Sequence, residues 1–150
     1  MELILWRHAD AEDAAPGTPD EARRLTAKGE RQAKRVAAWL KKQLPDDARI
    51  LASPARRAQQ TAQALTRRFK VSREVGMAAG PQSILDAAGW PAGEGTVVVV
   101  GHQPTLGQAA ALALTGSPAD WSVKKGAIWW LASREGGKTV VKAMIAPEMV

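Results

Sequence analysis

The two histidines of the chain each follow a short apolar run, and an arginine directly precedes the first of them. Arg7-His8 comes after the apolar residues 3–6, and Gly101-His102 comes after four valines at 97–100. A third polar cluster is Ser53-Pro54-Ala55-Arg56-Arg57. Guanidinium groups and the free N–H groups of helix starts both bind phosphate oxygens. A histidine among them can attack phosphorus, so the three clusters predict a phosphate site if the fold brings them together.

The elements around these clusters predict such a fold. The valine run is bounded by glycines and is typical of a central parallel strand. Strands are predicted over residues 3–6, 49–53, 96–100, 126–133 and 139–145, with a short one near Val75. Helices are predicted from Thr26, as N-cap, to Pro45, from Pro54 to about Phe69, from Pro81 to Ala88 and from Pro104 to about Leu114.

This order predicts an α/β fold, a single-domain three-layer α/β/α sandwich over residues 1–150. Its sheet is expected to be mostly parallel, with an antiparallel edge formed by a hairpin that turns at residues 134–138. Ligands bind at the carboxyl ends of strands in open α/β sheets. The three polar clusters stand at three such ends, so we expect them in one crevice.

Composition excludes several classes of function. The chain has no cysteine, which excludes a disulfide scaffold, a thiolate zinc site and a cysteine nucleophile. The net charge of +6 comes from bases scattered at helical spacings, without an aromatic stacking platform, so no nucleic-acid partner is expected. No apolar run approaches the roughly 20 residues of a membrane span, and Glu2 stands where a signal peptide would be basic. We therefore expect a cytoplasmic protein.

Four motifs resemble those of the histidine phosphatase superfamily, which has the phosphoglycerate mutase-like fold. They are Arg7-His8-Ala9, Leu25-Thr26-x-x-Gly29, Ser53-Pro54-x-x-Arg57-Ala58-x-x-Thr61-Ala62 and Val97-Val98-Val99-Val100-Gly101-His102-x-Pro104. Alanine stands at position 9, where glycine is commoner. The opening residues 7–11 and the stretch Arg23-x-Leu25-Thr26 further resemble the SixA-type phosphohistidine phosphatases.

The resemblance implies a role for each matching residue. His8 is the expected nucleophile, and Arg7 and Arg57 are expected to bind the phosphoryl oxygens. His102 is expected to donate a hydrogen bond to the charge that develops in the transition state. No metal and no cofactor are implied. Successive helical residues point about 100° apart, so only one of Arg56 and Arg57 can easily enter the crevice. The spacing of the family motif selects Arg57, and Arg56 is expected to be a solvated surface charge.

The chain departs from the superfamily at the acid that protonates a leaving oxygen. His102 is followed by Gln103, and residues 75–81 contain no carboxylate. Asp10, Glu12 and Glu74 are either substitutes or loop charges. Three further residues also have two interpretations each. Thr61 either orients Arg57 or packs in the core, and Trp90 and Trp121 either fill the core or form a hydrophobic wall beside the crevice.

The function implied is that of a metal-independent phosphohydrolase with a phosphohistidine intermediate. The expected substrate is phosphohistidine in a protein. The alternatives are a small-molecule phosphomonoesterase of the same superfamily and a non-catalytic, phosphate-dependent binding module. A mutase is disfavoured, because 150 residues leave little chain for insertions that close over the site.

Overall fold

Six strands form one mixed sheet, and the two strands that directly precede the histidines lie side by side at its centre. The computed structural model describes all residues, 1–150. The strands are β1 (Glu2–Arg7), β2 (Arg49–Ala52), β3 (Lys70–Val71), β4 (Thr96–Gly101), β5 (Ile128–Ser133) and β6 (Thr139–Ile145). Their order is β3-β2-β4-β1-β5-β6; β1 to β4 run parallel, and β5 is antiparallel to both of its neighbours. The predicted sheet, mostly parallel with an antiparallel edge, is confirmed.

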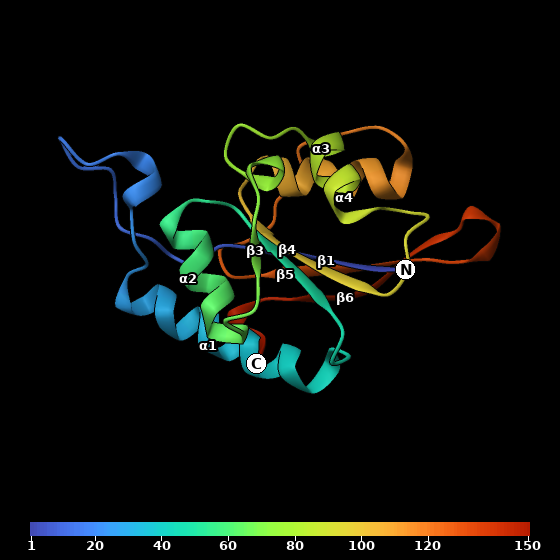
Figure 1. Cartoon of the computed structure of the whole chain (residues 1–150), viewed down its shortest axis with the longest axis horizontal. Coiled ribbons are helices and arrows are strands. Elements are labelled where there is room, and N and C mark those ends of the chain that lie inside the picture. Colours follow the sequence, from blue (N-terminus) through green and yellow to red (C-terminus); the bar gives the residue numbers. More distant parts are fainter.

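Two pairs of helices cover the two faces of this sheet (Figure 1). The helices are α1 (Ala27–Gln43), α2 (Arg56–Leu65), α3 (Pro81–Ala88) and α4 (Thr105–Thr115). Alternate strand residues face opposite sides of a sheet. Leu3 and Leu5 therefore pack in the core under α3 and α4, whereas Ile4 and Trp6 pack in the core under α1 and α2. The result is the predicted three-layer sandwich.

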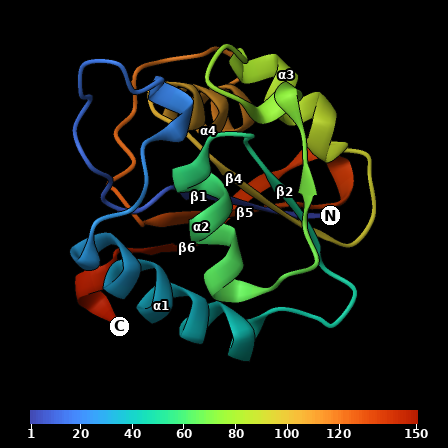
Figure 2. The same cartoon turned by 60° about the vertical axis from the view of Figure 1, so that its left-hand side comes forward.

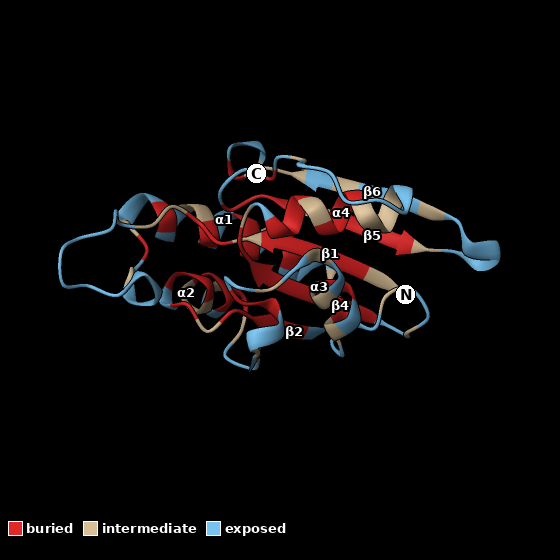
Figure 3. Ribbon diagram, turned by 90° about the horizontal axis from the view of Figure 1, so that it is seen from above, coloured by how far each residue is buried: buried red, intermediate tan, exposed pale blue.

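Burial follows this layering. Figure 3 shows that buried residues lie in the sheet and on the helix faces that pack on it, whereas the loops at both ends are exposed. All six residues of β4 are buried, as expected of a central strand with helices on both faces. None of the helices is both long and apolar enough to span a membrane.

Helix α1 begins where the sequence predicts. The Thr26 hydroxyl accepts the Gly29 N–H at 3.0 Å, the hydrogen bond of an N-cap. The same hydroxyl donates to the Asp10 carboxylate at 2.7 Å. Gly29 itself packs against the backbone of Asp10 so closely that a Cβ would lie 1.9 Å from the Asp10 carbonyl oxygen. These contacts hold the first turn of α1 against the segment that follows His8.

Two predictions of secondary structure are wrong, one about the end of a helix and one about a strand. Helix α2 ends at Leu65 rather than near Phe69, because Thr66 is extended and the chain turns back to pair as β3 with β2. The short strand predicted near Val75 is instead a 3-10 turn, Arg73–Val75. The side chain of Val75 is 1% exposed and packs in the core, and this burial accounts for an apolar residue here without pairing in the sheet.

Candidate active site

The parallel register brings the three polar clusters to one edge of the sheet. Arg7 at the end of β1 is the register partner of Gly101 at the end of β4. The backbone N–H of His8 donates to the Gly101 carbonyl at 3.0 Å, and Ser53, after β2, donates its N–H to Val100 at 3.0 Å. The rings of His8 and His102 consequently lie with their centroids 5.2 Å apart.

A cavity of about 360 Å³ opens at this edge. Its lining consists of Arg7, His8, Ala11, Asp13, Asp20, Arg23, Arg57, Met77, His102, Gln103 and Lys125. The four predicted site residues are all among them. Four cationic side chains and two carboxylates give the cavity an excess of positive charge, which suits a small anionic group.

The His8 ring is held in one tautomer. Its Nδ1 lies 2.7 Å from the Ala9 carbonyl oxygen, which can only accept a hydrogen bond. Nδ1 must therefore carry the proton, and Nε2 carries the lone pair. Burial and the charges of Arg57 and Arg7 lower the pKa of His8 to about 4. At neutral pH the ring is therefore an uncharged imidazole with a nucleophilic nitrogen.

The hydroxyl of Ser53 holds His102. His102 Nε2 lies 2.7 Å from Ser53 Oγ, which also accepts the N–H of Ala55 at 3.2 Å. Burial, the neighbouring His8 and the charge of Arg57 lower the pKa of His102 to about 3. A neutral His102 that accepts the Ser53 proton at Nε2 carries its own proton on Nδ1, which has no acceptor within the protein. This arrangement leaves one ring N–H to donate to a bound anion.

Arg7 and Arg57, two of the three arginines that line the cavity, are held at their outer nitrogens. Arg7 Nη1 donates to the Val123 carbonyl at 2.9 Å. Arg57 is 3% exposed, and its Nη1 and Nη2 donate to the backbone carbonyl and the carboxylate of Asp20 at 2.8 and 3.1 Å. The Nε atoms of both arginines are buried and have no acceptor within the protein. Both guanidinium groups line the cavity, where their positive charge can bind the oxygens of a phosphoryl group.

Arg56 lies apart from the cavity. It is exposed and lines a different surface depression, beside Pro54 and Gln59. The helical spacing therefore separates the two adjacent arginines as predicted from the sequence. Thr61 supports the backbone rather than the Arg57 guanidinium, since its hydroxyl donates to the Arg57 carbonyl and accepts the Ala9 N–H.

Sequence reasoning missed Asp20 and Arg23. Asp20 lies in the 3-10 turn Asp20–Ala22 of the long loop after β1, and its carboxylate accepts from Arg23 at 2.8 Å and from Arg57 at 3.1 Å. Partial burial raises the pKa of Asp20, but the hydrogen bonds and charges of Arg23 and Arg57 lower it overall. The spacing of three residues between Asp20 and Arg23 was the only sequence signal for this pair, and it does not indicate contact with Arg57.

None of the three carboxylates proposed as substitute acids lines the cavity. Asp10 is held by Thr26 and by Lys125, Glu12 pairs with Arg24, and Glu74 is exposed. The carboxylates in the cavity are Asp13 and Asp20.

The two tryptophans considered as a wall also lie elsewhere. Trp121 packs against Trp129 with ring centroids 5.7 Å apart, and Trp90 packs against the core under α3 and α4. Neither lines the cavity.

The chain is similar to known proteins in both sequence and fold. The sequence model of the histidine phosphatase superfamily (branch 1) matches residues 3–77, half of the chain. An uncharacterized protein of Picosynechococcus sp. is 36% identical over 141 residues, which cover 89% of this chain and 86% of that protein.

Solved structures show the same fold over nearly the whole chain. A structure of the protein histidine phosphatase SixA complexed with tungstate is 25% identical, covers 99% of both chains and superposes with a TM-score of 0.84. A putative phosphohistidine phosphatase SixA from Agrobacterium tumefaciens is 27% identical, covers 97% of both chains and gives a TM-score of 0.79. The chain therefore belongs to the histidine phosphatase superfamily (branch 1) and is a phosphatase with the fold of SixA.

Proposed function

We propose that this phosphatase hydrolyses phosphohistidine in a protein substrate, without a metal ion, through a phosphorylated His8. The observation that carries the proposal is His8 itself, a neutral imidazole whose Nδ1 is bound to Ala9. Its Nε2 lone pair is thereby left for the cavity that Arg7, Arg57 and His102 also line. The relatives named as SixA support the same substrate class.

The reaction has two steps. His8 Nε2 attacks phosphorus, a P–N bond forms to His8, and the P–N bond to the substrate imidazole breaks while that ring takes up a proton from solvent water. A water molecule then attacks phospho-His8, the P–N bond to Nε2 breaks, and phosphate leaves. Arg7 and Arg57 neutralise the phosphoryl oxygens in both steps, and the N–H of His102 stabilises the charge that develops.

The ionised state of Asp20 in the cavity bears on which leaving group the enzyme can expel. Arg23 and Arg57 keep the pKa of Asp20 low, so it is ionised at neutral pH and has no proton to donate. Expelling an alkoxide needs such a proton, whose delivery is worth roughly 10²–10⁴ in rate. A leaving imidazole is a much weaker base and is protonated near neutrality. The cavity therefore favours P–N substrates over alkyl phosphates.

A rapid-quench experiment tests the intermediate. One phosphoryl group should appear on the peptide that contains His8, stable in base and labile in acid, and His8→Ala should abolish it. Full activity of His8→Ala would refute the mechanism. Retained phosphohistidine binding without phosphorylation of His8 would identify a binding module instead.

A substrate panel tests the leaving group. The ratio kcat/KM should be higher for phosphoramidate and a phosphohistidine peptide than for a sugar phosphate and a phosphoserine peptide, and excess EDTA should not change it. If the alkyl phosphates react as fast, an acid operates in the cavity and the small-molecule phosphomonoesterase becomes the better assignment. Asp13 and Asp20 are then the first residues to replace.

A further inference from the structure

Helix α1 carries nearly all of the positive excess of the chain. It has one acidic residue, Glu30, and six basic ones, a balance of +5 in a chain whose net charge is +6. The basic residues are Lys28, Arg31, Lys34, Arg35, Lys41 and Lys42. The structure contains six ion pairs, and none of them uses a cation of α1.

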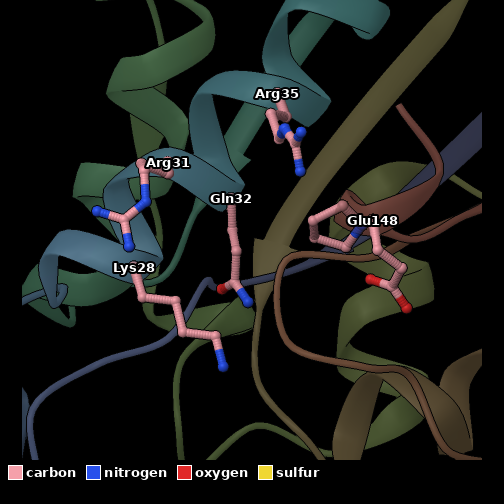
Figure 4. Close-up of a pocket in the computed structure, with 6 residues that line it drawn as sticks. Lys28, Arg31, Gln32, Arg35 and Glu148 are labelled. Atoms are coloured by element: carbon pink, nitrogen blue, oxygen red, sulfur yellow. The ribbon is translucent and has the colours of Figure 1, made fainter.

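Three of these cations line one groove. Lys28, Arg31 and Arg35 lie along a groove of about 580 Å³ between α1 and the C-terminal 3-10 turn Pro147–Met149. Figure 4 shows them on the helix, with Glu148 across the groove. Glu148 is the single acid there and already pairs with Lys124 at 3.5 Å. The groove, which we call the α1 groove, thus presents unpaired cations over a span of about 10 Å, seven residues at the helical rise.

This arrangement costs the helix stability. Lys28 and Arg31 are three residues apart, and Arg31 and Arg35 are four apart. Like charges at these spacings repel one another and destabilise the helix. A surface that serves only solubility intersperses both signs of charge. No carboxylate of the folded chain forms an ion pair with these cations to offset their repulsion. This pattern indicates that the cations bind another molecule.

The α1 groove adjoins the active-site cavity. Gln32, in the floor of the groove, accepts the backbone N–H of Asp10, two residues after His8. Lys125, in the lining of the cavity, pairs with the Asp10 carboxylate at 3.1 Å. Figure 2 shows the C-terminal segment beside the first turns of α1, on the side where the loop leaves β1. The negative charge of Asp10, which contacts both Gln32 of the groove and Lys125 of the cavity, is offset by the Lys125 ammonium.

From this placement we propose that the α1 groove docks an acidic surface of the phosphorylated protein substrate next to its phosphohistidine. The inference rests on the proposed function. Charged and polar side chains make up the lining of the groove apart from Pro147, and such a lining disfavours a small organic ligand. A row of exposed cations instead attracts a complementary row of carboxylates and accelerates encounter at low ionic strength.

Two phosphohistidine peptides test the proposal. They have the same length and the same residues around the phosphohistidine, and differ in a distal run that is glutamate in one and glutamine in the other. The groove variant is Lys28→Gln/Arg31→Gln/Arg35→Gln. The matched control is Lys34→Gln/Lys41→Gln/Lys42→Gln, which removes three exposed cations from the same helix but outside the groove.

At low salt the native protein should have a kcat/KM about tenfold higher for the acidic peptide than for the neutral one. The groove variant should lose this preference and keep its kcat/KM for phosphoramidate, whereas the control variant should keep the preference. Equal rates of the native protein on both peptides, or equal losses in the two variants, would overturn the docking site. If the native protein hydrolyses alkyl phosphates but neither peptide, the proposed function itself fails.

Discussion

Arg56 and Arg57 are adjacent in sequence but occupy different environments. Arg57 is buried against Asp20 and lines the cavity, whereas Arg56 is exposed and lines a different surface depression. Arg57→Ala should lower kcat by about 10²–10³, as the loss of one donor to a developing charge does. Arg56→Ala should leave kcat within about twofold, because it removes a surface charge with no partner in the cavity. Steady-state kinetics of the two variants measures these changes in kcat. Equal losses of kcat would contradict the assignment of Arg57, and not Arg56, to the phosphate site.

The two histidines are the only ones in the chain, so each can be observed directly. Burial lowers their pKa values to about 4 for His8 and about 3 for His102, from an ordinary 6.5. In ¹⁵N-histidine NMR spectra neither ring should titrate near pH 6.5, and His8 should show the tautomer with its proton on Nδ1. A ring that titrates at its ordinary pKa would be incompatible with a neutral nucleophile held by Ala9.

At the scale of elements, the packing of α1 against the end of β1 sets the position of the residues after His8. Gly29→Ala should destabilise the protein, although alanine in a helix is usually better than glycine by about 1 kcal/mol. The reason is the Asp10 carbonyl, 1.9 Å from where the Cβ would stand. Urea unfolding measures the effect, and a loss of activity should accompany it, because Asp10 would have to move.

Gly80→Ala is the matched control. Gly80 is the residue before α3, it has a negative φ, and a Cβ there would meet no atom within 4 Å. The free energy of unfolding should change little. If both alanine variants are equally stable, the contact between α1 and the segment after His8 is looser than the structure indicates.

For the whole molecule, the buried histidines make stability depend on pH. Between the unfolded pKa of about 6.5 and the folded value of about 4 for His8, the unfolded chain binds protons that the folded chain does not. Folding stability therefore falls as pH decreases through this range, by about 2 kcal/mol per histidine between about pH 7.5 and about pH 5. The lowered pKa values of Asp10 and Asp20 add a loss at still lower pH.

Urea unfolding in a buffer without phosphate measures this dependence. The variant His8→Gln/His102→Gln removes both groups and should show a flatter profile over the same range. Inorganic phosphate should restore part of the stability of the native protein, because it binds only the folded state. A native profile as flat as that of the variant would show that the histidines are not desolvated.

Some features could be predicted from the sequence because they depend on local patterns. A run of valines bounded by glycines has few alternatives to a buried strand, and Thr26 caps α1 through an atom only three residues away. Parallel strands end at one edge of a sheet, so the order of the strands already placed His8 near His102. The helical angle indicated that only one of Arg56 and Arg57 enters the crevice, and the resemblance to the family motif selected Arg57.

Other features were decided only by tertiary structure. The loop from residue 9 to residue 25 has no periodicity that fixes its path, so the contact of Asp20 with Arg57 depends on how it folds over the sheet edge. The end of α2 and the 3-10 turn at Val75 depend on the pairing of β3 and on burial, which local propensity does not encode. The α1 groove needs the C-terminal turn, more than a hundred residues further along the chain, to form its second wall. The sequence by itself determined which residues could do the chemistry, and long-range packing decided which charges surround them.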